Sequence, residues 1–170
     1  MRSPIPLALT VMLIAGVAAA QGNWKEFSYP KDGFAAQYPT EPKIEEHPYQ
    51  TALGSSVTER VYAFNSGGVV YMVAIADFSR IRPDESKAID EAAKTLIASG
   101  KLTHDVSARI DWHYGREIRV EDSAGTSYTD AIFLIENKLF QLKVVYPADN
   151  TDPVGSSGIH FFQQAFRLLH

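Results

Sequence analysis

The chain contains no cysteine among its 170 residues. This absence excludes structural disulfides, cysteine-ligated metal sites and a lipid-modified N-terminal cysteine. A domain of roughly 150 residues can nevertheless rely on its core, because it buries about two-thirds of the surface that its unfolded chain exposes. A protein of this size that is exported to the bacterial periplasm can therefore fold without disulfides.

No apolar run after residue 20 is long enough to cross a membrane. At the N-terminus, Arg2 precedes the apolar stretch 7–17, and three alanines then end at Ala20. This order predicts a signal peptide over residues 1–20, cleaved between Ala20 and Gln21. An uncleaved anchor is disfavoured because a membrane-spanning helix needs ~20 apolar residues. The mature chain 21–170 is therefore expected to be periplasmic or secreted, without a membrane span.

Long runs of charge of one sign are also missing. The formal net charge is -4, and loss of Arg2 with the signal peptide makes it -5. Since the charged residues are scattered, no basic patch for nucleic acid is expected.

Recognisable catalytic motifs are absent as well. The chain has no G-x-S-x-G, no H-E-x-x-H and no phosphate-binding glycine loop. We therefore assign no catalytic, cofactor-binding or metal-binding residue, expect no cofactor, and favour a protein that is not an enzyme.

Asp111, His113 and Arg116 are the weak polar candidates. Asp111 and His113 lie two residues apart in a strand expected over 102–113, a spacing that could begin a metal site. No third ligand stands at a telling distance, so solvated positions on an exposed strand face are the favoured interpretation.

If Ile118 faces the core, Arg116 lies on the core-facing parity as well. A buried arginine needs a carboxylate partner. An ion pair that fixes strand register is favoured over substrate binding, with these candidate partners: Glu59, Asp77 and Asp130.

The rest of the pattern predicts strands joined by short turns. Two stretches are apolar on both parities, as in central strands covered on both faces: 69–76, and the AIFLI core of a strand expected over 127–136. The remaining strands are expected over 24–29, 33–38, 57–65, 102–113, 116–121 and 139–146.

Two helices complete the expected domain. One covers about 84–99, capped by Asp84 and ended by Gly100. A short C-terminal helix is expected at about 155–165. Because short turns join antiparallel strands, we predict a single α+β domain with a mostly antiparallel sheet between these helices, a three-layer α/β/α sandwich.

Three segments carry a resemblance to a known family. They are the opening hairpin FSYPKDGFAAQYPTEPK, the mid-chain amphipathic helix and the closing FFQQAFRLL after VVYP. Together they resemble the PsbP/Mog1-type α/β/α sandwich, and short exported bacterial proteins of unassigned function. PsbP-like proteins support photosystem II and Mog1-like proteins bind a small GTPase, but no functional residues of either match here. The resemblance therefore implies the fold only.

The sequence favours an exported, non-catalytic binding or accessory module of the bacterial cell envelope. A protein partner there is expected to contact edge strands or exposed aromatics such as Trp24 and Tyr29. Two alternatives stay open: a periplasmic hydrolase with a site assembled across strands, and a carrier of a small apolar ligand. The oligomeric state is not predicted.

Overall fold

The structure is a computed structural model that describes residues 24–51, 54–147, 158 and 161–169. The expected signal peptide and its Ala20–Gln21 junction lie outside this part. The strands and the helix follow each other as β1 (Lys25–Tyr29), β2 (Phe34–Tyr38), β3 (Lys43–Gln50), β4 (Ser56–Ser66), β5 (Val69–Asp77), α1 (Glu85–Ile97), β6 (Lys101–Ile110), β7 (His113–Glu121), β8 (Thr126–Ile135), β9 (Lys138–Pro147) and β10 (Arg167–Leu168).

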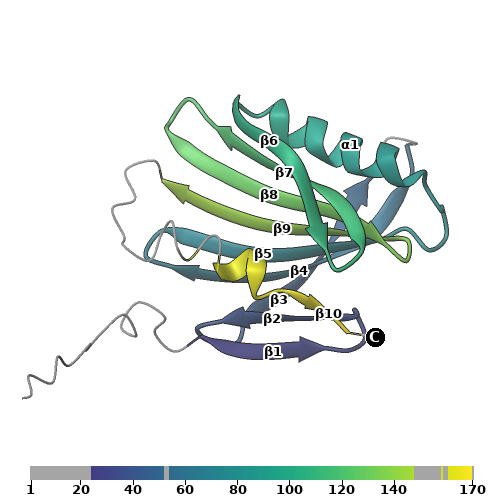
Figure 1. Cartoon of the computed structure of the whole chain (residues 1–170), viewed down its shortest axis with the longest axis horizontal. Coiled ribbons are helices and arrows are strands. Elements are labelled where there is room, and N and C mark those ends of the chain that lie inside the picture. Colours follow the sequence, from purple (N-terminus) through teal and green to yellow (C-terminus); the bar gives the residue numbers. More distant parts are fainter. Residues whose placement is uncertain (1–23, 52–53, 148–157, 159–160, 170) are drawn as a thin grey trace, which may run out of the picture.

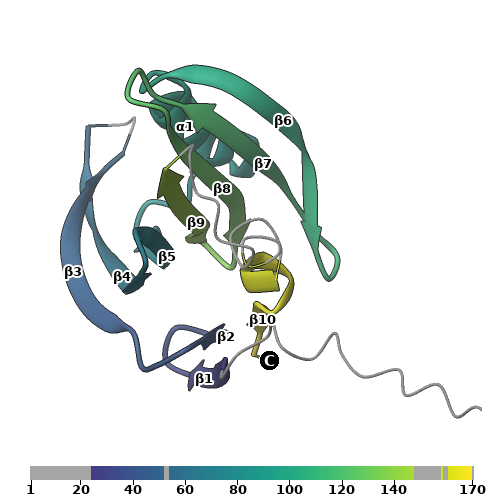
Figure 2. The same cartoon turned by 90° about the vertical axis from the view of Figure 1, so that its left-hand side faces the viewer.

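Among the described residues, two antiparallel sheets form. The large sheet has the order β3-β4-β5-β9-β8-β7-β6, and the small sheet has the order β1-β2-β10. After β5 the chain crosses along α1 to the far edge, and then returns strand by strand until β9 pairs with β5. The large sheet curves around α1, while the small sheet lies on the opposite side (Figures 1 and 2).

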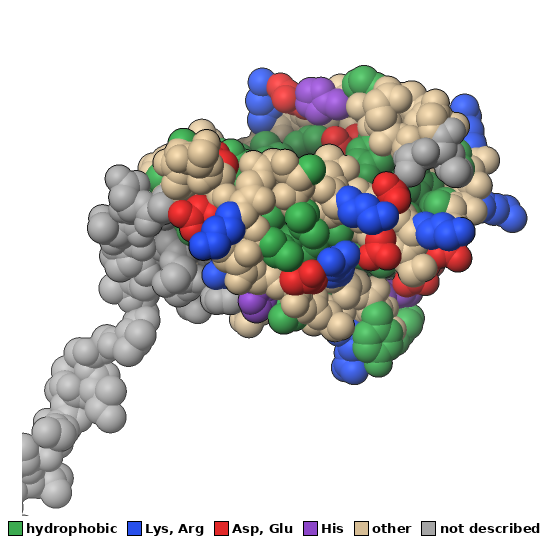
Figure 3. Space-filling model, turned by 90° about the horizontal axis from the view of Figure 1, so that it is seen from above, with side chains coloured by type: hydrophobic (Ala, Val, Ile, Leu, Met, Phe, Trp, Pro, Cys, Tyr) green, Lys and Arg blue, Asp and Glu red, His purple; other side chains and the backbone are tan. Residues whose placement is uncertain are grey.

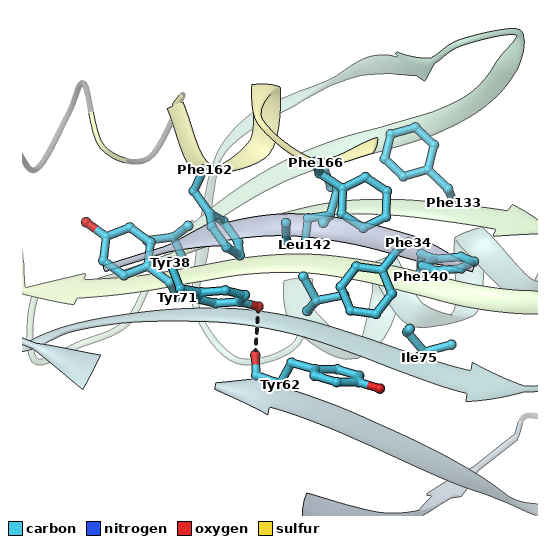
Figure 4. Packing of buried hydrophobic residues seen from close by; sticks show 14 of the residues in the cluster. Phe34, Tyr38, Tyr62, Tyr71, Ile75, Phe133, Phe140, Leu142, Phe162 and Phe166 are labelled. Carbon is cyan, nitrogen blue, oxygen red and sulfur yellow. Dashed lines mark hydrogen bonds between the residues drawn. The ribbon is translucent and has the colours of Figure 1, made fainter. Parts of the chain in front are cut away.

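The central strands are apolar on both faces, as expected. In β8, Phe133 packs in the core shared with the small sheet, whereas Ile132 and Leu134 pack in the core beneath α1. The first core is rich in aromatic rings from both sheets (Figure 4). Within it, the Tyr38 hydroxyl donates a hydrogen bond to the Tyr62 carbonyl oxygen over 3.1 Å. Burial of these rings holds the two sheets together.

The mid-chain helix is confirmed. The Lys87 N–H donates to Asp84 Oδ1 over 3.1 Å, so Asp84 caps the first turn. The small side chains Ala88, Ala92 and Ala93 are buried against the sheet, which lets the helix approach it closely.

The C-terminal segment is only partly helical in the described residues. Residues 161–164 are helical, and Arg167 and Leu168 then pair with β2 as β10. The face opposite α1 is thus covered by this helical turn together with the small sheet. The structure confirms an α+β fold with mostly antiparallel strands, and the three-layer arrangement stays a prediction.

Candidate functional site

Asp111 and His113 do not share a strand face. β6 ends at Ile110, and Asp111 turns the chain with a positive φ of 52°. His113 begins β7 opposite Ile110. The single strand predicted over 102–113 was therefore wrong, because Asp111 adopts the left-handed conformation that aspartate tolerates in tight turns. In the described part of the chain, no three His, Asp or Glu side chains converge as metal ligands.

Arg116 is held by carboxylates other than those expected. Its Nε and Nη2 bind Asp105 over 2.8 and 2.7 Å, and its Nη1 binds Asp90 on α1 over 3.0 Å. The fork of hydrogen bonds from Arg116 lowers the pKa of Asp105. The prediction that the partner of Arg116 is Glu59, Asp77 or Asp130 was wrong. The interpretation as a structural ion pair agrees with these contacts, which join β6, β7 and α1.

One recess on the α1 side lies between the helix and the large sheet. α1 contacts β7 and β8, while β3 and β4 lie across from it at the other end of the sheet (Figure 2). The space between them is a groove of about 420 Å³, lined by Leu96 of α1, Tyr49, Met72 and Asp130. We call this the α1 groove. From above, hydrophobic side chains are visible in a recess among charged ones (Figure 3).

Asp130 is the exceptional residue of the α1 groove. Its side chain is on the floor, in the middle of β8, and only 2% of the residue is exposed. Its Oδ1 has no hydrogen-bond partner among the described residues. Burial raises the pKa of Asp130 to about 6, the positive charge of Lys143 opposes this rise, and Glu59 adds to it.

The neighbours of Asp130 are set by strand register. Lys143 of β9 is directly opposite, and Gln141 lies two residues before Lys143 in the same strand. Gln141 is buried and shares a hydrogen bond with the Tyr49 hydroxyl, which lowers a Tyr49 pKa that burial raises. The groove therefore combines a buried acid, a lysine and a bonded amide–phenol pair within apolar walls.

From the sequence, Asp130 was a candidate only as a partner for Arg116. The signal that could have singled it out is its place directly before Ala131–Ile135, because an acidic residue there adjoins a run that is apolar on both faces. A charge at such a position is costly unless it is paired.

A second feature is the tip of the β6–β7 hairpin. Five large hydrophobic side chains are exposed among the described residues. Four of them belong to this hairpin: Leu102, Val106, Trp112 and Tyr114. Trp112 and Tyr114 are 66% and 67% exposed at the tip. The prediction that Trp24 and Tyr29 are exposed was wrong. Both side chains are partly buried and pack against the core between the sheets.

The described chain has no helix that is both long and apolar enough to cross a membrane. No protein-family profile matches the sequence, and no curated protein matches it. Among solved structures, the chain is similar to the solution structure of cyanobacterial PsbP (CyanoP) from Synechocystis. The TM-score is 0.58 at 16% identity, over 91% of this chain and 96% of that chain. The protein therefore has a PsbP-like fold.

Proposed function

We propose that this protein is an exported, non-catalytic binding module of the bacterial cell envelope that docks a protein partner through its β6–β7 hairpin. One observation carries the proposal: exposed large apolar side chains are concentrated on this hairpin, with two aromatics at its tip. Aromatic side chains that are exposed in the free protein are typical anchors of protein interfaces.

The two edges of the large sheet support the same surface. β3 carries four charged or histidine side chains together with Pro48, features that protect an edge against pairing. β6 forms the other edge and presents Leu102 and Val106 to solvent, 39% and 43% exposed. β6 carries as many charged or histidine side chains as β3, but it contains no proline and exposes two large apolar side chains where β3 exposes one, Ile44.

A protein partner suits the tip better than an anionic lipid surface. Trp112 is flanked by Asp111, whose negative charge would be repelled by acidic headgroups. The PsbP-like fold also supports an accessory role, as the resemblance to PsbP-like proteins implies, although a shared fold does not fix a function.

Affinity capture from envelope extracts tests the proposal. We expect the mature protein and its Ile44→Ser variant to capture the same protein, because Ile44 is exposed at the opposite edge. The double variant Trp112→Ser/Tyr114→Ser should lose it. A parallel panel of esterase, phosphatase, glycosidase and peptidase substrates should show no turnover. Turnover that disappears on changing a single carboxylate would replace the proposal with the hydrolase alternative.

A further inference from the structure

We propose that the α1 groove is a binding site for a small, mainly apolar amine whose ammonium group pairs with the carboxylate of Asp130. This inference is independent of the hairpin surface and goes beyond the docking function. It begins with Asp130 Oδ1, an acceptor that is buried and has no partner among the described residues. Buried polar atoms are nearly always hydrogen-bonded, so an orphaned one in a groove indicates a missing donor.

The residues around the groove favour a cation over an anion. Asp122 and Asp130 line it, and the charges of Glu59 and Glu91 act on its Tyr49. Lys143 is the one cationic side chain among the residues described as lining the groove. The acidic groups thus outnumber the basic one, and a carboxylate ligand would meet net negative charge.

The other acidic lining residue is already satisfied. Asp122 Oδ1 accepts hydrogen bonds from the backbone N–H groups of Ala124 and Thr126, and Oδ2 accepts one from the Tyr128 hydroxyl over 3.1 Å. Asp130 is therefore the groove carboxylate that has an oxygen left to accept a hydrogen bond from a ligand.

The walls define the rest of the ligand. Met72, Ala92, Leu96 and Val145 supply apolar contacts, with the ring of Tyr49 at the β3 side. The volume of about 420 Å³ falls in the range of small-molecule sites. An alkyl chain can be buried there while its ammonium group reaches Asp130.

Calorimetric titration of the mature protein at pH 8 with n-octylamine, 1-octanol and octanoate tests the proposal. We expect octylamine to bind most tightly, since the other two have the same chain but no cation. Asp130→Asn should weaken octylamine binding by about tenfold or more, because a hydrogen bond between two charged groups is lost. The matched control Asp111→Asn makes the same change at the hairpin turn and should bind as the unmodified protein does.

Two further measurements test the proposal even if Asp130→Asn alters the fold. Lys143→Met should bind octylamine more tightly, because the lysine competes for the same carboxylate. In the unmodified protein, octylamine affinity should rise between pH 5 and pH 7, as Asp130 loses its proton. Octanoate binding as tightly as octylamine, unchanged affinity in Asp130→Asn, or a flat pH profile would each overturn the proposal.

Discussion

At the residue scale, Asp130 makes the stability of the fold depend on pH. Its carboxyl group is buried between α1 and the large sheet, and its pKa is raised to about 6 because burial disfavours the charged form. The folded state therefore holds this proton more tightly than the unfolded state, in which the pKa is near 3.8. Ionisation of Asp130 destabilises the fold.

The sign of the pH dependence follows from this shift. The contribution of Asp130 to the free energy of unfolding is complete below pH 4 and falls by about 3 kcal/mol as the pH rises through about 6. Asp130→Asn removes the titration. In urea unfolding, the variant should therefore gain stability relative to the unmodified protein between pH 4 and pH 7.

The same urea series on Asp111→Asn is the control, since Asp111 is exposed at a turn. Its stability relative to the unmodified protein should change little over this range. If Asp130→Asn behaved like Asp111→Asn at every pH, the buried and unpaired state of Asp130 would be contradicted.

Sequence patterns identify polar residues more easily than they identify their surroundings. Asp111 and His113 were candidates because they were assigned to one strand, and a turn separates them. The structure places the turn at Asp111, so that Gly115 lies within β7, where a Cβ would collide with the Ile132 carbonyl and the Phe133 ring. The position of this turn is not determined by local pattern.

At the element scale, α1 is the part that sequence predicted best. Its cap and its buried face are encoded within a few residues, by Asp84 and by the helical spacing from Ala88 to Ala93. The edge strand β3 was missed, because nearly all of its side chains are exposed and it contains Pro48. Its pairing with β4 depends on contacts that are not local.

Packing of α1 on the sheet can be measured by substitution. Ile89 is buried in the core beneath the helix, so Ile89→Ala should lower the free energy of unfolding by about 2–5 kcal/mol. Lys94 is on the exposed side and forms a surface ion pair with Glu91, so Lys94→Ala should change the free energy of unfolding by less than about 0.5 kcal/mol. Equal effects in denaturant melts would argue against this packing.

At the scale of the whole molecule, the two sheets are joined by contacts between distant parts of the chain. Arg60 of β4 binds Asp32 in the β1–β2 turn over 2.9 Å and so joins the two sheets, whereas Arg167 of β10 binds Glu26 of β1 over 2.6 Å within the small sheet. The central strands and the α+β class were predictable from local periodicity. The docking of the small sheet and the opening of the α1 groove were not, since they depend on how the large sheet curves.

Export is a property of the whole chain and is still a prediction. Mass analysis of the protein recovered from the periplasm should give a mature N-terminus at Gln21, following cleavage after Ala20. A periplasmic protein that retains Met1 would contradict the expected signal peptide.

Docking through the β6–β7 hairpin can be tested by site-specific photo-crosslinking in living cells. A photoreactive residue at position 114 should give one discrete crosslinked product with an envelope protein, because Tyr114 lies at the exposed tip. The same residue at position 44, exposed on the opposite edge, should give none. No product from position 114, or the same product from both positions, would contradict docking through the β6–β7 hairpin.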